Sequence, residues 1–185
     1  MRFDNDQELI KALKTGDETA CESLLDEYEL PIYRFFYYSH GHHQTAQDQC
    51  GETFFRLMTA VQKNGTGCVN HMRAYLYGIA RNILAEHYRK QSLMDEYRLK
   101  QHLPHQPSVY QQVSAQDELA YVWRIISQFD EPQRQILLLR FMENIRYEEI
   151  AAIMAMPINS VKSYIHRGRK KLCELLAENN SFEMR

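Results

Sequence analysis

The chain has little glycine and proline, with 7 Gly and 5 Pro among 185 residues. Both residues mark the turns on which β proteins depend, whereas Leu, Ala, Glu, Gln and Arg, which are plentiful here, favour helices. No apolar run approaches the roughly 18 residues that a membrane span needs. The composition therefore predicts an all-α protein without a membrane span, and we expect it to be cytoplasmic.

Motifs of catalysis and metal binding are also missing. The sequence has no P-loop, no dinucleotide-binding fingerprint and no pairing of a nucleophile with a base. Without a CxxC pair, neither a zinc site nor a disulfide framework is expected. The four cysteines lie far apart: Cys21, Cys50, Cys68 and Cys173. We therefore expect a protein that is not an enzyme and has no cofactor.

The formal net charge of −2 hides an uneven distribution. Residues 1–60 carry 5 basic and 11 acidic residues, and residues 61–101 carry 7 and 3. Residues 102–150 carry 4 and 7, and residues 151–185 carry 6 and 3. This alternation is typical of two modules with one basic face each, and a basic face favours a polyanion as partner. Ordinary solvated helix surface would give the same pattern, so charge alone leaves both interpretations open.

Apolar residues recur at helical spacing throughout the N-terminal half. Pro31 is expected to kink the second helix, and "NGTG" at 64–67 is the clearest turn. "TAQD" at 45–48 has the spacing of a helix start. Four helices are expected there: 7–15, from a cap at Asp17 past Phe36, 45–63, and from Met72 to about Arg89.

Residues 91–114 are polar and glutamine-rich and contain Pro104 and Pro107, which is typical of a linker. Helical periodicity returns at "SAQD" (114–117) and again at "DEPQ" (130–133). We therefore expect two small helical domains joined by a flexible linker, with the boundaries 1–92, 93–113 and 114–185.

The segment "YEEIAAIMAMPINSVKSYIHRGRKKL" at 147–172 predicts a helix-turn-helix. "AMPIN" interrupts the first helix, and Val161, Ile165, Gly168 and Leu172 then follow at steps of 4, 3 and 4. The second helix of this motif enters the major groove, where amides and cations meet bases and phosphates. The candidates lie on its other side or in the basic "RGRKK": Asn159, Ser160, Lys162, Ser163, His166, Arg167, Arg169 and Lys170.

Four segments resemble bacterial RNA polymerase sigma factors of the extracytoplasmic-function (ECF) group, in the family's order. They are "GDETACESLLDEYELPIYRFFYYS", "AQDQCGETFFRLM", "HMRAYLYGIARNILAEHYRK" and "FDEPQRQILLLRFMENIRYEEIAAIMAMPINSVKSYIHRGRKKL". The resemblance implies a dissociable subunit that binds core RNA polymerase and promoter DNA and directs promoter-specific initiation. It also implies a monomer when free, and members of the family often have an anti-sigma factor as a partner.

By the same resemblance, the helix matching 45–60 docks on the clamp helices of the polymerase, and Ile136–Met142 meets the flap. The implied polymerase contacts are Gln47, Asp48, Glu52, Thr53 and Arg56. The loop matching 63–71 and the helix after it are implied to read and open the −10 element. The residues for that role are Asn64, Asn70, His71, Arg73, Tyr75, Tyr77, Arg81, Arg89 and Lys90. The amphipathic position of both tyrosines leaves open whether they belong to the core instead.

The helix matching 157–170 is implied to read the −35 element, but the turn before it departs from the family pattern. Ala155 stands where the family commonly has Gly, and Pro157 stands where it often has Ser. A positive φ at Ala155 would cost about 1 kcal/mol. Tyr75 also replaces a common Trp. The sequence therefore leaves the geometry of the turn open.

Two other function classes fit parts of the pattern. A transcription repressor would use 1–90 for sensing or dimerisation and 115–185 for binding DNA as a dimer on a palindrome, without polymerase. A metal-dependent protein would use "SHGHH" with Cys50, although His40, His42 and His43 lack an i, i+4 pair. Sedimentation with gel shifts separates the first class from a sigma factor, and zinc titration tests the second.

Overall fold

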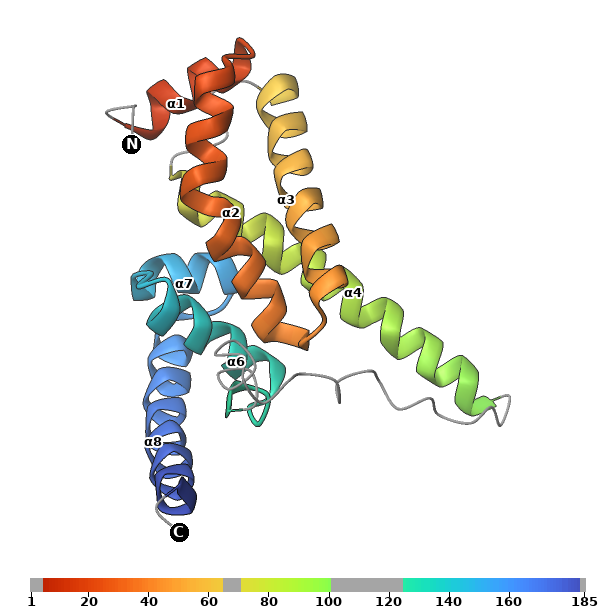
Figure 1. The fold of residues 1–185 in the computed structure, drawn as a ribbon, viewed down its shortest axis with the longest axis vertical. Helices are drawn as coiled ribbons and strands as arrows, with labels where there is room; N and C mark the ends of the chain where they lie inside the picture. The colour runs from red at the N-terminus through yellow and green to blue at the C-terminus, as the bar shows by residue number, and fades with distance from the viewer. Residues whose placement is uncertain (1–4, 65–70, 101–124, 184–185) are drawn as a thin grey trace. The chain divides into compact units, whose positions relative to one another are not determined.

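The computed structural model of the chain describes residues 5–64, 71–100 and 125–183, and these residues form helices without a strand among them. The prediction of an all-α protein is confirmed. None of the described helices is long and apolar enough to cross a membrane. The elements, shown in Figure 1, are α1 (Asp6–Lys14), α2 (Glu18–His40), α3 (His43–Asn64), α4 (Met72–Lys100), α6 (Glu131–Leu137), the π-helix η2 (Leu138–Met142), α7 (Tyr147–Met154) and α8 (Ile158–Glu183).

The chain divides into two compact units. The first contains Met1–Phe36 and His42–Gln112, and the second contains Tyr37–Gly41 and Val113–Arg185. This division accords with two helical domains, while the boundaries at 92 and 114 stay predictions.

Helices α1 to α4 form the first unit around one apolar core. Asn5 caps α1, because its Oδ1 accepts a hydrogen bond of 3.0 Å from the Glu8 N–H. Asp17 caps α2 as predicted, accepting from the Thr19 N–H at 2.8 Å. Helix α3 packs along α4, and α1 also contacts α3. The fully buried side chains include Leu9, Ile10, Leu13, Ile32, Phe35, Leu57, Met72, Leu76, Tyr77 and Leu84.

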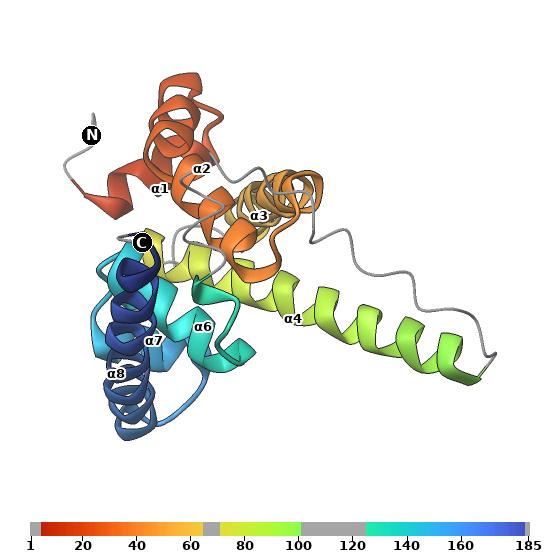
Figure 2. The same cartoon turned by 60° about the horizontal axis from the view of Figure 1, so that its bottom comes forward.

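Two helix ends in this unit differ from the sequence-based expectation, whereas α2 runs past Phe36 to His40 as expected. Helix α4 continues beyond Arg89 to Lys100. The C-terminal part of α4 extends away from the other helices of its unit in both ribbon views (Figure 2). Helix α3 begins at His43 and not at Thr45, because the His42 Nδ1 accepts from the Thr45 N–H at 3.3 Å. A histidine cap was therefore missed.

Helices α6, α7 and α8 with η2 form the described core of the second unit. Both α6 and α7 pack against α8. A Cβ atom on Gly168 of α8 would lie 2.5 Å from a methyl carbon of Leu137, so a larger residue there would force the Leu137 side chain of α6 to shift. Asp130 precedes α6 with extended backbone, and Pro132 occupies its first turn as predicted.

Candidate functional site

The turn between α7 and α8 has the geometry of a helix C-cap closed by a left-handed residue. Ala155 has φ 51° and ψ 46°. Its N–H donates to Ala152 O at 3.2 Å, and the Met156 N–H donates to Ala151 O at 3.0 Å, which is the Schellman pattern. Pro157 then starts α8, its carbonyl accepting from the Ser160 N–H at 2.9 Å. The turn thus keeps a tight helix-turn-helix geometry at a strain cost of about 1 kcal/mol for alanine.

Helix α8 separates a buried side from an exposed polar side. Val161, Ile165 and Gly168 are buried. Ser160 is half-buried, and the Ser163 hydroxyl donates to the Asn159 carbonyl of its own helix at 2.9 Å. The structure therefore brings the predicted −35 candidates onto one helix, and seven of the eight are exposed: Asn159, Lys162, Ser163, His166, Arg167, Arg169 and Lys170.

Two cations of the basic segment 167–171 have aromatic partners that the sequence did not reveal. The Arg167 guanidinium lies 5.0 Å from the centroid of the Tyr164 ring, which holds its stem along the helix surface. Lys171 turns inward: its Nζ donates to the Gln128 carbonyl at 2.6 Å and lies 4.8 Å from the Phe129 ring centroid. The i, i+3 spacing of Tyr164 and Arg167 was a usable signal, whereas the contacts of Lys171 depend on tertiary packing.

The −10 candidates on α4 divide between surface and core. His71, Arg73, Arg89 and Lys90 are exposed, and Tyr75 and Arg81 are half-buried. Tyr77 is fully buried, with its ring edge-to-face against Phe35 at a centroid distance of 5.5 Å. Of the two possibilities that the sequence left open for Tyr77, the structure favours the core, where its ring packs against α2. Asn70 and the side chain of Asn64 lie outside the described residues.

The start of α4 is held by a residue that sequence reasoning missed. Asp6 of α1 accepts a hydrogen bond of 2.9 Å from the Met72 N–H through its Oδ2. A carboxylate at this position satisfies one of the free donors at a helix start and complements the positive end of the helix dipole. The 66 residues that separate the two partners explain why no local pattern indicated the contact.

The docking candidates on α3 also differ in exposure. Gln47 and Asp48 are exposed, and Glu52 and Arg56 are half-buried. Thr53 is fully buried, and its hydroxyl donates to the Gln49 carbonyl at 2.8 Å. Thr53 is thus a core residue and not a surface contact, because its side of α3 packs inward.

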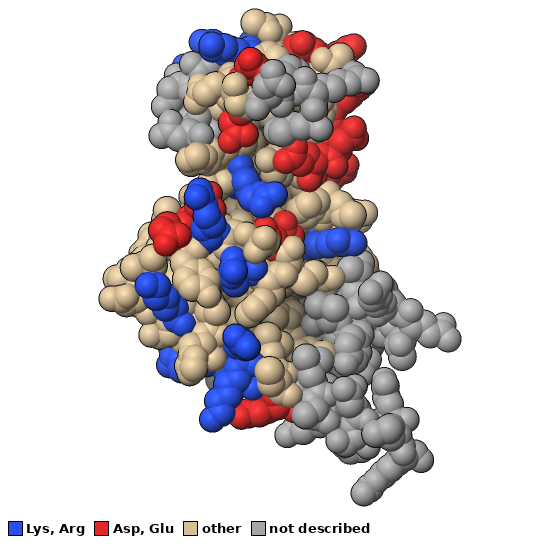
Figure 3. Space-filling model, turned by 90° about the vertical axis from the view of Figure 1, so that its left-hand side faces the viewer, with Lys and Arg blue, Asp and Glu red and all other residues tan. Residues whose placement is uncertain are grey.

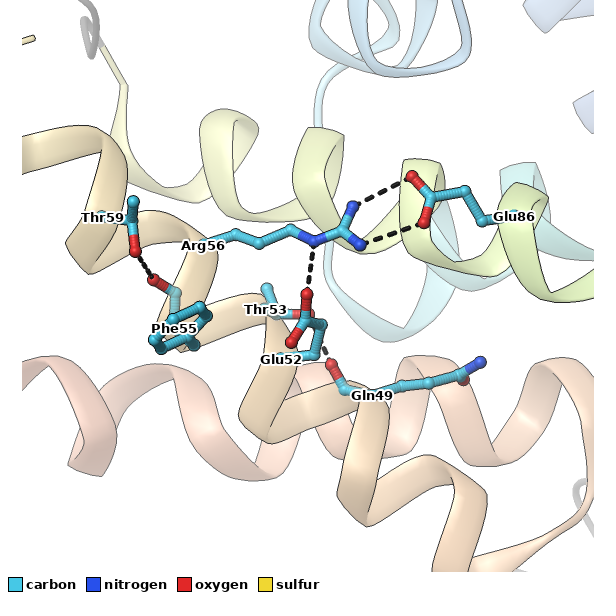
Figure 4. A network of polar contacts seen from close by, with 7 residues as sticks. All are labelled: Gln49, Glu52, Thr53, Phe55, Arg56, Thr59 and Glu86. Carbon is cyan, nitrogen blue, oxygen red and sulfur yellow. Dashed lines mark hydrogen bonds and ion pairs between the residues drawn. The ribbon is translucent and has the colours of Figure 1, made fainter. Parts of the chain in front are cut away.

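Arg56 is engaged by two carboxylates (Figure 4). Its Nε donates to Glu52 Oε1 at 2.7 Å, and its two terminal nitrogens donate to the two carboxylate oxygens of Glu86 on α4, each at 3.0 Å. The hydrogen bonds that Arg56 donates to Glu86 and Glu52 raise the pKa of Arg56, and the hydrogen bond from Arg56 lowers the pKa of Glu86. Arg56 and Glu86 are therefore both charged at neutral pH.

An exposed aromatic residue lies on the same helix. The side chain of Phe55 is 67% exposed and, in Figure 4, points away from Glu86. Exposed aromatic residues are enriched at interfaces, which makes Phe55 a docking candidate that the sequence missed.

A cavity of about 470 Å³ lies between α2 and α3. It is lined by Leu25, Glu29, Leu30, Tyr33, Gln47, Cys50, Gly51 and Phe54. Burial raises the pKa of the Cys50 thiol to about 12, so this thiol is protonated and inert.

The η2 segment carries two further exposed apolar side chains. Phe141 is 51% exposed and Met142 is 43% exposed, whereas Leu138 and Leu139 are buried. The Arg140 guanidinium lies 5.1 Å from the Tyr147 ring centroid and donates to the Ile145 carbonyl at 3.2 Å. The segment expected to meet the polymerase flap thus presents Phe141 and Met142.

The histidine segment has structural contacts in this structure. His42 caps α3, and His43 contacts the Tyr33 hydroxyl through Nδ1. Within the ranges that the structure describes, no group of three or more His, Cys, Asp or Glu side chains is placed to hold a metal ion.

Red aspartate and glutamate side chains gather in the upper part of the face drawn in Figure 3. Figure 1 draws α1 and the start of α2 at that upper level, in agreement with the acidic excess of residues 1–60.

Two family models match the chain. "Sigma-70 region 2" matches residues 24–93, and "Sigma-70, region 4" matches residues 119–172. An all-α chain with a region 2 match followed by a region 4 match that contains the helix-turn-helix has the organisation of a sigma factor. The chain belongs to the sigma-70 family and, within it, to the ECF group.

Known relatives agree with this placement. The chain is 28% identical to the ECF RNA polymerase sigma factor BldN of Streptomyces coelicolor over 93% of its length, and spans 66% of BldN. It is 25% identical to SigW of Bacillus subtilis over 91% of its length, and spans 95% of SigW. The sigma factor RpoE of Bartonella quintana, solved in complex with the anti-sigma factor NepR, shares the fold. The TM-score is 0.66 at 22% identity, covering 85% of this chain and 96% of RpoE.

Proposed function

We propose that this protein is an alternative sigma factor that binds core RNA polymerase and directs promoter-specific initiation of transcription. The main support for this proposal is that both sigma regions occur in one chain, in the family's order. Each region also places cations on the surface of one helix. These cations are Arg73, Arg89 and Lys90 on α4, and Lys162, Arg167, Arg169 and Lys170 on α8.

Helix α8 reads the −35 element in this proposal. Its exposed side presents an amide, hydroxyls and cations after a tight turn, and these groups pair with base edges and phosphates in the major groove. Asn159 and Lys162 lie in its first turns, the part of a recognition helix that enters the groove. Arg167, Arg169 and Lys170 lie further along and suit phosphates.

Helix α4 and the segment before it read and open the −10 element. Arg73, Arg89 and Lys90 hold the strand backbone, and the half-buried Tyr75 offers an aromatic face to a displaced base. With Tyr77 in the core, only one of the two tyrosines serves this role. The domains for the two elements are 1–92 and 114–185, with 93–113 between them.

The polymerase contacts lie on α3 and η2 in this proposal. Gln47, Asp48 and Phe55 face outward on α3 and suit the clamp helices, and Phe141 and Met142 suit the flap. The chain supplies recognition and no chemistry of its own, and it acts in the cytoplasm. We also propose an anti-sigma factor as a regulatory partner, as NepR is for RpoE in the complex from Bartonella quintana.

In-vitro transcription with bacterial core polymerase and a library of upstream sequences tests the proposal. We expect specific transcripts that share two sequence elements, and we expect them to disappear with the variant Lys162→Ala/Arg167→Ala. The matched control is Lys11→Ala/Lys14→Ala, which removes two exposed cations from α1. Failure to give specific transcripts, combined with a dimer that binds duplex DNA tightly without polymerase, would overturn the proposal in favour of a repressor.

A further inference from the structure

Arg56 lies on the helix proposed to dock on polymerase, but its guanidinium faces the neighbouring helix α4 (Figure 4). The Nε and both terminal nitrogens donate to carboxylate oxygens of Glu52 and Glu86 at 2.7 to 3.0 Å. A partner protein would have to break this arrangement to bind the guanidinium. The contact with Glu86 is bidentate, which fixes the orientation of the guanidinium relative to the carboxylate as well as the distance between them.

We propose that Arg56 is a positioning residue and not a polymerase contact. With Glu52 and Glu86, a set that we name the α3–α4 clasp, it holds the polymerase-docking helix in one register against the promoter-opening helix. Promoter opening therefore depends on the clasp, and the affinity for polymerase does not. This inference rests on the proposed function and refines the role of one residue within it.

The exposure of the clasp argues against a main role in global stability. The side chains of Arg56, Glu52 and Glu86 are 37%, 43% and 42% exposed. Ion pairs with this exposure contribute little to the free energy of folding, because water already solvates the charges well. The planar fork of Arg56 instead adds a directional contact between α3 and α4, whose other contacts are mainly apolar and non-directional.

The position of Glu86 on α4 gives the clasp a second consequence. Glu86 precedes Arg89 by three residues and Lys90 by four, and both cations help to lower its pKa. Residues at these spacings are neighbours on a helix surface. Arg56 holds both oxygens of Glu86 on the α3 side, which leaves Arg89 and Lys90 for DNA phosphates. Without Arg56, Glu86 would pair with the two cations and weaken their contact with DNA.

The test measures two steps separately in Arg56→Ala, Glu86→Ala and the double variant. One readout is the dissociation constant for core polymerase by fluorescence anisotropy, and the other is promoter opening by permanganate reactivity at saturating polymerase. We expect the dissociation constant to stay within about twofold and opening to fall about five- to tenfold in the single variants, with the larger loss in Arg56→Ala, where Glu86 is freed to pair with Arg89 and Lys90. The double variant should lose no more than Arg56→Ala. Arg56→Lys, which keeps the charge and loses the fork, should lose opening about as much as Arg56→Ala.

Gln62→Ala, at another exposed position of α3, is the matched control and should behave as the wild type. Thermal unfolding of every variant should stay close to that of the wild type. A loss of polymerase affinity of tenfold or more in Arg56→Ala with normal opening, or additive losses in the double variant, would overturn the inference alone. A wild-type chain that forms no open complex would overturn the proposed function and the inference with it.

Discussion

The two helices with candidate DNA contacts, α8 and α4, hold their cations in different ways. On α8, the exposed cations follow a tight turn and point away from a side sealed by Val161, Ile165 and Gly168. Among the described residues, no acidic side chain forms an ion pair with them. On α4, Arg89 and Lys90 share their surface with Glu86, which Arg56 engages from α3. The exposed cations of α8 therefore need no residue from another helix to keep them available, whereas those of α4 depend on Arg56 of α3.

The sharpest way to test this difference is to compare the salt dependence of two double variants. Lys162→Ala/Arg167→Ala on α8 and Arg89→Ala/Lys90→Ala on α4 each remove two exposed cations. We expect the α8 variant to lose about tenfold or more in promoter binding by the holoenzyme and about two units of salt slope. The α4 variant should lose less in slope, because Glu86 already offsets part of its charge. Filter binding over a salt series measures both, and equal slopes would contradict the comparison.

The next largest effect is expected at Gly168, where α6 crosses α8. Gly168→Val forces Leu137 out of its place and should lower the free energy of unfolding by about 2 kcal/mol. Gly78→Ala on α4 is the matched control, since nothing lies within 4 Å of its added Cβ. It should raise stability by up to about 1 kcal/mol through helix propensity. Urea denaturation measures the free energy of unfolding of both variants. Equal changes at Gly168 and Gly78 would contradict the close contact between Gly168 and Leu137.

A smaller effect of opposite sign is expected at Ala155. Ala155→Gly relieves the left-handed strain and should stabilise the protein by about 0.5 to 1 kcal/mol, without loss of promoter binding. Ala152→Gly, at a position with helical backbone in the last turn of α7, is the control and should destabilise by about the same amount. Chemical denaturation of the wild type and the two variants gives the sign of each change in the free energy of unfolding. A destabilised Ala155→Gly would contradict the left-handed conformation at this position.

The smallest effect concerns His87 on α4. Burial, and then the charges of His42 and Lys90, lower the pKa of His87 below its usual value of 6.5. The unfolded chain therefore binds its proton more readily, so this part of the stability is present above pH 6.5 and declines as the pH falls below it. His87→Gln should flatten the dependence of the urea midpoint on pH between 7.5 and about 5. An unchanged slope would show that other groups dominate.

Local patterns were sufficient for much of this molecule. The apolar steps at Val161, Ile165 and Gly168 predicted which side of α8 is buried, and Asp17 was predicted as a cap. Thr53 was misplaced because its neighbours Glu52 and Arg56 on α3 lie just outside the buried stripe, whereas Thr53 lies at its edge. Tyr77 was left open, since an aromatic residue at an amphipathic position fits both core and surface.

Other features were beyond local reasoning. The pair of Arg56 and Glu86 joins residues 30 positions apart, and Lys171 meets Gln128 across 43 positions. Such contacts depend on how the helices cross, which no short pattern specifies. The His42 cap was missed for a different reason, since histidine is seldom chosen for that role and Thr45 offered a more familiar signal.

The hydrogen bond from the Met72 N–H to Asp6 has a practical consequence for anyone who trims this protein. The match to region 2 begins at residue 24, so a fragment that starts there would keep Arg73, Arg89 and Lys90 of α4 and discard α1. Helix α4 would then start with an unanchored first turn. Under the proposed function, the amino-terminal helix α1 would therefore contribute to strand separation by holding the start of α4, without touching DNA itself.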